Sequence, residues 1–361
     1  MDLKITKGKA TDFEIELAEN RPVRILQFTD PQITDIDTTR TKIRYDQIKG
    51  CYFGDGIFDD DYRVYDLMNE VVERVKPDII TVTGDIVYGE TDDSGVHFSR
   101  FIAEMEKYKI PWIPVFGNHD NESAKGVRWQ CAQFEKAEYC VFARGKVTGN
   151  CNFSVAVKGK DRVEALLMML DTNGCHVFNN PGTLGEGMMA DNPDIDIIEQ
   201  REGIFPDQIE WYEQTVKNAK EFYGDNNLLS LAFFHIAPSK AMELYVERYG
   251  SVSSRLEKQG KGDFGAMDNF EDTVPVDLDH SFDDMARRVG TKGMFFGHEH
   301  ENSFSLLDGD MRYTFGLKTG LHNSYRLDHV GGTLITADGK NAKVEHIYYD
   351  YKPYDFEKNK K

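Results

Sequence analysis

Long apolar runs are missing from this chain of 361 residues. No stretch reaches the length that a membrane-spanning helix needs, so we expect no membrane segment. The first twenty residues, MDLKITKGKATDFEIELAEN, lack the apolar core that a signal peptide requires. A chain without either feature is expected to lie in the cytoplasm. An exported protein whose leader is absent from this sequence is the alternative.

Cysteine is also scarce. Cys51, Cys131, Cys140, Cys151 and Cys175 are an odd number, and none of them are in C-x-x-C spacing. This pattern does not suit a disulfide framework or a tetrahedral zinc site. It favours reduced thiols, which agrees with a cytoplasmic location.

Positive charge is in deficit: 43 Lys and Arg face 62 Asp and Glu, for a net charge of −19. Such a surface repels a polyphosphate backbone, so we expect no general nucleic-acid binding. A small anion is still an acceptable ligand, because a bound metal ion can reverse the local field. Hydrophobic residues make up 40% of the chain, enough for a sizeable core. We find no repeat or linker, which predicts a single domain over residues 1–361.

Five short apolar runs each end abruptly in side chains that can bind a metal ion. Each is rich in β-branched or aromatic residues and bounded by Gly, Pro or polar residues, which predicts a buried strand. The runs are VRILQFTD (23–30), PDIITVTGD (77–85), IPWIPVFGNHD (110–120), LLSLAFFH (228–235) and GMFFGHEH (293–300).

Two segments with helical periodicity lie between the first three of these runs. Residues 60–75 and 96–108 have apolar side chains at three-and-four spacing, which predicts amphipathic helices. Alternating strands and helices indicate a largely parallel sheet, and ligands of such sheets gather at the carboxyl ends of the strands. Every metal-capable side chain noted above occupies such an end.

The rest of the chain adds strands to this unit. Apolar runs at 152–159 and 162–171 predict strands, and 206–222 predicts a helix. Runs at 311–317, 331–337 and 343–350 predict further strands, which we expect to form a second sheet packed on the first. Two stretches without clear periodicity, 172–203 and 239–279, are expected to be insertions near the site.

The ordered series D-x-Q, GD, GNHD, a lone His after an aromatic run, and GHEH resembles the calcineurin-like metallophosphoesterase superfamily. The resemblance runs from about residue 24 to 303, and the stretch TFGLKTGLHNSYR (314–326) is similar to a purple acid phosphatase-like branch. It implies an α/β fold, the four-layer αββα sandwich, in which helices flank two mixed sheets.

The resemblance also implies two adjacent metal ions. Asp85 would bridge them, because two cations roughly 3.5–4 Å apart need an anion between them. The first ion would be held by Asp30 and His300, with Gln32 as a further candidate ligand, and the second by Asn118, His235 and His298. Mixed oxygen and imidazole donors suit Mn, Fe or Zn.

The function implied is hydrolysis of a small phosphorylated substrate by a metal-bridging hydroxide, with a monoester favoured over a diester. His119 would stabilise the developing charge or protonate the leaving oxygen. Asp120 would either orient the His119 ring or cap the following helical segment. The alternatives are a phosphodiesterase of cyclic nucleotides or glycerophosphodiesters, and a binding or scaffold protein with an impaired metal centre.

One motif departs from the family pattern. The usual D-x-H is Asp30-Pro31-Gln32 here, and an amide oxygen is a poorer donor than imidazole. Purple acid phosphatases also lack that histidine and use a tyrosinate from GDxxY. This chain has GDIVY, so Tyr88 is either an iron(III) ligand or a packing residue.

Overall fold

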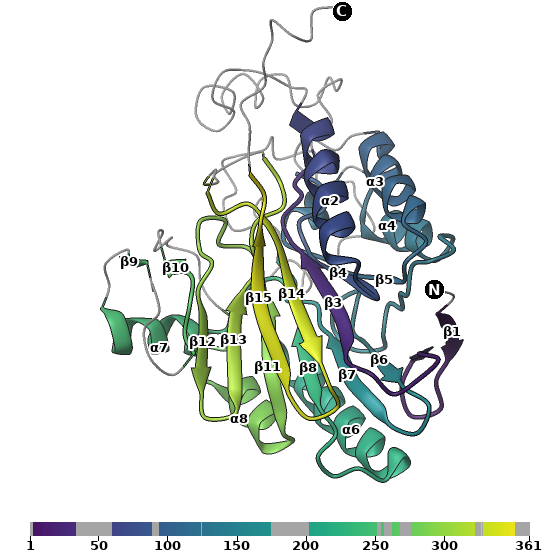
Figure 1. The fold of residues 1–361 in the computed structure, drawn as a ribbon, viewed down its shortest axis with the longest axis vertical. Coiled ribbons are helices and arrows are strands. Elements are labelled where there is room, and N and C mark those ends of the chain that lie inside the picture. Colours follow the sequence, from purple (N-terminus) through teal and green to yellow (C-terminus); the bar gives the residue numbers. More distant parts are fainter. Residues whose placement is uncertain are drawn as a thin grey trace, which may run out of the picture.

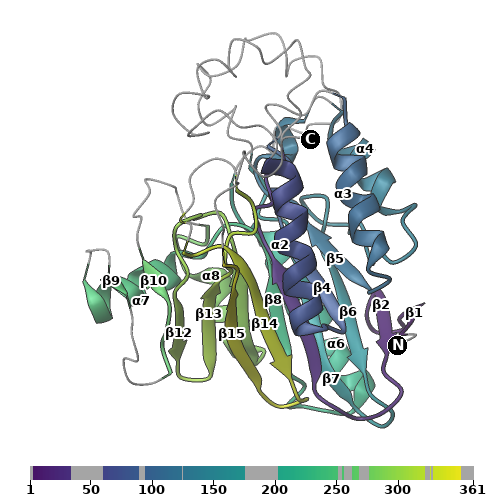
Figure 2. The same ribbon diagram turned by 45° about the horizontal axis from the view of Figure 1, so that its top comes forward.

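The computed structural model describes residues 3–33, 60–88, 94–123, 125–174, 202–250, 254–255, 262–267, 276–321, 326 and 328–350. Two large mixed sheets lie face to face within these residues, and helices cover the outer side of each (Figures 1 and 2). The layers run from α6, α7 and α8 through the larger sheet and the smaller sheet to α2, α3 and α4. The expected four-layer αββα sandwich is therefore confirmed.

The smaller sheet has the strand order β15-β14-β3-β4-β5. Its strands β3 (Val23–Phe28), β4 (Ile79–Thr83) and β5 (Trp112–Val115) are parallel to one another. Helices α2 (Asp60–Val75) and α3 (Val96–Lys107) connect them, as the periodicity predicts. Strand β14 (Gly331–Ala337) pairs antiparallel with β3, and β15 (Ala342–Tyr348) pairs antiparallel with β14.

The larger sheet has the order β1-β2-β6-β7-β8-β11-β13-β12. At its centre β7 (Val163–Met169), β8 (Ser230–Phe233), β11 (Thr291–Phe296) and β13 (Met311–Phe315) are parallel. The remaining strands are β1 (Lys4–Lys7), β2 (Phe13–Glu16), β6 (Phe153–Lys158) and β12 (Ser305–Asp308).

Two hydrophobic cores follow from the alternation of side chains along the central strands. On β7, Leu167 and Met169 face the core between the sheets, whereas Leu166 and Met168 face the outer helices. Burial on both faces explains why these strands are continuously apolar in sequence. The outer core is closed by α6 (Pro206–Tyr223), α7 (Ser239–Tyr249) and α8 (Ser281–Arg288), and α4 (Val127–Phe134) covers the smaller sheet.

One expectation about the sheets is wrong in detail. The strands after residue 300 do not make a second sheet by themselves, since β12 and β13 join the larger sheet and β14 and β15 the smaller. The reason is pairing: β14 completes the edge of β3, which the strand-helix-strand unit leaves open. The strands that precede the candidate metal ligands are thus split between the two sheets.

The expected insertions lie largely outside the described residues. Residues 175–201 of the first and most of the second after residue 250 are not described. Residues 239–249, which show no clear periodicity, form α7, and β9 (Ser254–Arg255) pairs with β10 (Ala266–Met267). That both stretches are insertions stays a prediction.

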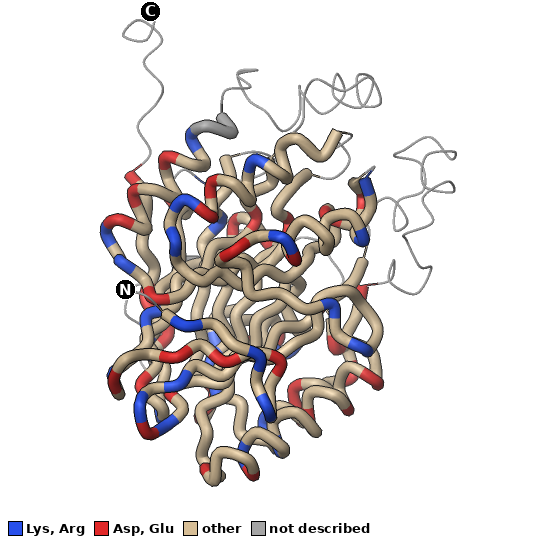
Figure 3. Tube along the Cα trace, turned by 90° about the vertical axis from the view of Figure 1, so that its right-hand side faces the viewer, with Lys and Arg blue, Asp and Glu red and all other residues tan. Residues whose placement is uncertain are grey.

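Cysteines and charges agree with the composition. Cys131, Cys140 and Cys151 form no disulfide, and the other two cysteines lie outside the described residues. Charged residues of both signs follow the outer helices and loops, while the strands between them are mostly uncharged (Figure 3). Among the described helices, none is long and apolar enough to cross a membrane.

Candidate metal centre

The predicted site residues follow strands of both sheets. Asp30, Asp85 and Asn118 come just after β3, β4 and β5 of the smaller sheet. His235 comes after β8, and His298 and His300 after β11, in the larger sheet. Since all five strands present their carboxyl ends at the same side of the sandwich, the six side chains meet where the two sheets adjoin.

Four donor atoms surround one point in this cluster. The Nε2 atom of His235 lies 3.1 Å from Oδ1 of Asn118, 3.3 Å from Oδ1 of Asp85 and 3.3 Å from Nδ1 of His298. One ligand atom each from Asp85, His235 and His298 lies within 4.8 Å of the others. Asn118, His235 and His298 are the residues expected to hold the second ion, and Asp85 is the expected bridge.

A second group shares Asp85 with the first. Ligand atoms of Asp30, Asp85 and His300 lie within 4.8 Å of one another. Nε2 of His300 is 3.4 Å from Oδ1 of Asp30. Asp85 therefore belongs to both groups, which is the arrangement that two adjacent cations sharing one carboxylate require.

Two of the three motif glycines lie against carboxylates of the site. A Cβ on Gly117, in GNHD, would collide with the Asp85 carboxylate. A Cβ on Gly297, in GHEH, would collide with Thr29 and the Asp30 carboxylate. Because each loop lies directly against a carboxylate of the site, only glycine fits at these positions.

Four of the nine described non-glycine residues with positive φ lie in the loops that carry the site residues. Asp30, Gln32, Asp85 and His298 have φ values of 51°, 44°, 50° and 73°. A side chain other than glycine in this region costs on the order of 1–3 kcal/mol. Strain of this kind persists where the surrounding structure holds the side chains in place, and here it aims them into one cluster.

Comparison with known proteins agrees with this geometry. A model of the calcineurin-like phosphoesterase family matches residues 23–302, which is most of the chain. The chain belongs to the calcineurin-like phosphoesterase family. The matched residues contain both donor groups, so the resemblance of the sequence motifs to this family is confirmed.

Relatives within the calcineurin-like phosphoesterase family are distant. The chain is 22% identical over 270 residues to "Probable inactive purple acid phosphatase 28" of Arabidopsis thaliana, covering 71% of this chain and 61% of the relative. It is 22% identical over 256 residues to "Phosphatase DCR2" of Saccharomyces cerevisiae, covering 67% and 39%. The chain thus spans less than two thirds of either relative. A solved dimetal phosphatase from Danio rerio is similar with a TM-score of 0.44 and 11% identity, covering 90% of this chain and 99% of that one.

The donor groups fit metal ions chemically. The Nδ1–H of His235 donates to the Thr83 carbonyl at 2.8 Å, which leaves the Nε2 lone pair for the cluster. Nδ1 of His298 faces this Nε2 at 3.3 Å. Several lone pairs facing one another repel unless a cation or proton lies between them. This is the chemistry expected of a site built for cations.

Charges in the protein without metal show how the cluster is balanced. Burial disfavours the charged form of His235, yet the carboxylates of Asp85 and Asp30 outweigh it and raise the His235 pKa to about 9. Burial and the positive charge of His235 lower the pKa of His298 to about 3. Burial and the charge of Lys318 lower the pKa of His300 to about 4. Although burial opposes it, the histidines lower the pKa of Asp30 and of Asp85.

Metal binding should therefore release protons. At pH 7 the metal-free protein carries a protonated His235, whose Nε2 must lose its proton to bind a cation. We expect about one proton to leave per bound pair of ions, and metal affinity to rise with pH up to about 9. Titration calorimetry in buffers of different ionisation enthalpy measures this number. An observed binding enthalpy that is the same in every buffer would contradict proton release.

The predicted catalytic histidine has a carboxylate partner that the sequence did not point to. Nδ1 of His119 lies 2.6 Å from Oε2 of Glu122, three residues along the same 3-10 turn (η2, Asp120–Glu122). Glu122 is fully buried, and His119 is 9% exposed. The spacing H-x-x-E over residues 119–122 could have suggested this pair, but a His and a Glu three residues apart are not by themselves a distinctive pattern.

Asp120 holds the loops of the site. Its Oδ1 accepts the backbone N–H groups of Ile86 and Val87, and its Oδ2 accepts that of Gly117. Burial and the nearby Asp85 raise its pKa to about 8. These contacts tie the loop after β4 to the loop after β5. A catalytic role of Asp120 stays a prediction.

Tyr88 packs on His119, the predicted catalytic histidine. Its ring centroid lies 4.5 Å from that of His119, with an interplanar angle of 34°. This contact matches the packing alternative. A tyrosinate bound to iron(III) gives a visible charge-transfer band. Since Tyr88 packs on His119, we expect protein loaded with iron(III) to lack this band. An absorption spectrum with such a band in the wild type but not in Tyr88→Phe would identify Tyr88 as a ligand.

Gln32 contacts the cluster from the side of the first group. Its Nε2 donates to Oδ2 of Asp85 at 3.2 Å, and its Oε1 accepts from Nζ of Lys318 at 2.8 Å. Lys318 is 1% exposed and was not singled out from the sequence. It lies within the stretch 314–326 that resembles the purple acid phosphatase-like branch, where it is a charged residue among apolar neighbours.

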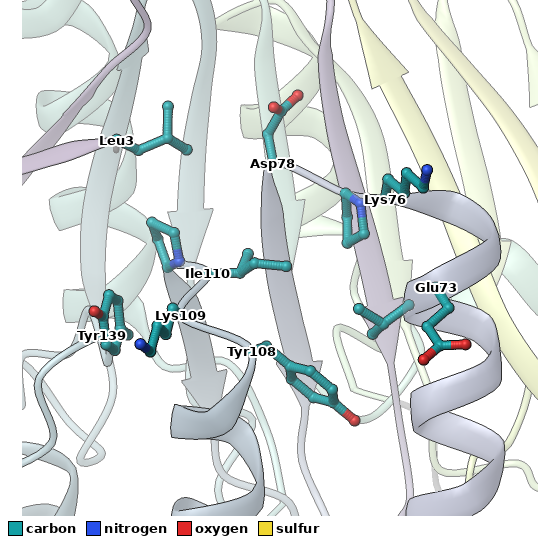
Figure 4. A pocket seen from close by; sticks show the side chains of 11 residues that line it. Leu3, Glu73, Lys76, Asp78, Tyr108, Lys109, Ile110 and Tyr139 are labelled. Carbon is teal, nitrogen blue, oxygen red and sulfur yellow. The ribbon is translucent and has the colours of Figure 1, made fainter. Parts of the chain in front are cut away.

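A separate hollow lies at the other end of the smaller sheet. It has a volume of about 880 Å³ and lies beside the amino ends of β4 and β5, where Lys76, Tyr108 and Lys109 line it (Figure 4). Both lysines are exposed. The hollow contains none of the predicted site residues, so it is not part of the metal centre.

Proposed function

We propose that this chain is a binuclear metal-dependent phosphoesterase that hydrolyses small phosphate esters, with monoesters preferred. The observation that carries this proposal is the pair of donor groups that share Asp85. Membership of the calcineurin-like phosphoesterase family supports it. In this proposal Asp30, Asp85 and His300 hold one ion, and Asp85, Asn118, His235 and His298 hold the other.

A bound pair of Mn, Fe or Zn ions would supply positive charge for the phosphoryl group and would activate a water molecule. The chain's own residues do the remaining work. His235 is fixed by Thr83 and supplies its Nε2 to the cluster. The Nδ1–H of His119 would donate to Glu122, so its Nε2 is the atom left for the leaving oxygen, and the imidazolium form would donate its Nε2–H there. Glu122, rather than Asp120, orients that ring in this proposal.

The test combines metal content with activity. Protein purified without chelator should contain about two metal ions per chain and hydrolyse p-nitrophenyl phosphate faster than bis(p-nitrophenyl) phosphate. Asn118→Ala should lower the rate by about 10²-fold or more, because it removes a neutral ligand of one group. Asn227→Ala is the control, because it makes the same substitution at an exposed position outside both donor groups, and it should be as active as the wild type. Full activity of Asn118→Ala would overturn the site assignment.

A second function has specific support. Gln32 replaces the usual histidine, and three relatives are named as probable inactive purple acid phosphatases. Both observations favour a binding or scaffold protein with an impaired metal centre. Protein that contains no metal and hydrolyses neither ester would support this alternative, whereas two ions with activity would exclude it.

A further inference from the structure

Lys318 places a positive charge inside the candidate metal centre. It follows β13, and its backbone bridges Thr29 beyond β3 and Val330 before β14. Its Nζ donates to Oε1 of Gln32 at 2.8 Å and to the Asp30 carbonyl at 3.2 Å. A buried ammonium is costly unless polar groups are fixed around it, so these contacts define where the charge lies.

The amide of Gln32 is oriented by two charges of opposite sign. Its oxygen faces the Lys318 ammonium, and its nitrogen faces the Asp85 carboxylate. Turning the amide over would place N–H groups against the ammonium and oxygen against the carboxylate, and both contacts would be repulsive. The backbone N–H of Gln32 also donates to the Asp85 carbonyl, which holds the residue in this position. The lone pair of Oε1 that accepts from Lys318 is not available to a cation, and a cation on the second lone pair would lie close to the ammonium charge.

We propose that Lys318 keeps Gln32 from ligating the first metal ion and weakens cation binding there, so that the two sites fill unequally. This inference rests on the proposed binuclear centre. The group of Asp85, Asn118, His235 and His298 has four donors and binds first. The group of Asp30, Asp85 and His300 has three donors and the ammonium beside it, so it binds more weakly.

The charge acts through both of its contacts. The ammonium lies within hydrogen-bond distance of the main chain of Asp30, a residue of the weaker group. Both residues are shielded from bulk solvent, because Lys318 and Asp30 are each 1% exposed. At short range in a site of this kind, like charges repel strongly enough to change an affinity by about tenfold or more. Gln32 then serves as a positioning residue between Lys318 and Asp85.

Calorimetric titration of chelator-treated protein with Mn²⁺ tests the proposal without measuring activity. The wild type should bind two ions in two steps of unequal affinity. Lys318→Met should tighten the weaker step by about tenfold or more and change the stronger step by less than about threefold. Gln32→Leu should change the weaker step by less than about tenfold, since Gln32 is not a ligand, whereas Asn118→Ala should weaken the stronger step.

Two variants control for charge and folding. Lys318→Arg keeps the charge and should retain two unequal steps. Lys158→Met removes a lysine that pairs with Glu14 at 3.0 Å, outside the metal centre, and should bind Mn²⁺ like the wild type. If circular dichroism shows that Lys318→Met does not fold, Lys318→Gln replaces it with the same expectation.

The outcomes separate this inference from the proposed function. Two bound ions whose weaker affinity is unchanged in Lys318→Met would overturn the role of Lys318. Loss of the weaker step in Gln32→Leu would identify Gln32 as a ligand and overturn its positioning role. No Mn²⁺ binding by the wild type would overturn the binuclear centre itself.

Discussion

Replacing Asp85 with Asn is expected to reduce kcat/KM for p-nitrophenyl phosphate by on the order of 10⁴-fold or more. Asp85 is 1% exposed and is the residue common to both donor groups. The substitution keeps the shape of the side chain but removes the negative charge that two neighbouring cations need between them. Metal content, measured by inductively coupled plasma mass spectrometry, should fall below two ions per chain.

The local hydrogen bonds make this substitution more severe. Oδ1 of Asp85 accepts the backbone N–H of His119 at 2.9 Å, and Oδ2 accepts from Gln32. An amide has one oxygen only, so one of these donors would face an N–H group. His235, whose pKa the Asp85 charge helps to raise, would also lose part of its electrostatic partner.

Asp171→Asn is the matched control for the Asp85 variant. Asp171 is also buried and accepts the backbone N–H groups of Asn150 and Asn173 at 2.7 and 2.8 Å. It belongs to neither donor group. This variant should keep its metal ions, so a general effect of burying an amide can be separated from loss of the bridge. Asp85→Asn with wild-type metal content and activity would refute the shared-carboxylate arrangement.

Replacing His119 with Ala is expected to lower kcat by about 10²–10⁴-fold while metal content stays unchanged. His119 is adjacent to a candidate ligand in sequence, but its ring nitrogen pairs with Glu122 instead of lying in either donor group. If the ring protonates the leaving oxygen, phenyl phosphate should lose more rate than p-nitrophenyl phosphate, because phenolate is the poorer leaving group. Equal losses would indicate stabilisation of developing charge.

Glu122→Gln tests the orienting role of the buried carboxylate. We expect a fall in kcat of about tenfold with little change in KM, since loss of an orienting partner costs about 10–100-fold at comparable sites. Glu122→Asp shortens the side chain and should be intermediate between Gln and the wild type. Unchanged kinetics in Glu122→Gln would show that the ring keeps its orientation without this contact.

Much of the fold was predictable because its strands are buried on both faces. The run 79–83 is short, fully buried and composed of β-branched residues, which is typical of a strand covered on both faces. The helix at 60–75 was predicted with its observed bounds from one apolar stripe. The division of the strands between two sheets was not predictable, because a strand pattern carries no information on which edge the strand will pair with.

The candidate ligands were predictable by type and position. The structure brings together the residues that short motifs at strand ends predict as ligands, namely Asp30, Asp85, Asn118, His235, His298 and His300. Glu122 and Lys318 escaped because neither has a distinctive local pattern. Each matters through one contact. Glu122 contacts His119, three residues away in sequence, and Lys318 contacts Gln32, 286 residues away.

The amino-acid sequence by itself determined the chemistry of this protein: which oxygen and nitrogen donors end which strands, and which glycines let the loops approach them. Only the tertiary structure decided that Gln32 faces Lys318 and that Glu122 contacts His119. The physical reason is that side-chain identity is local, whereas the charge beside each side chain depends on strands that are paired and stacked from distant parts of the chain.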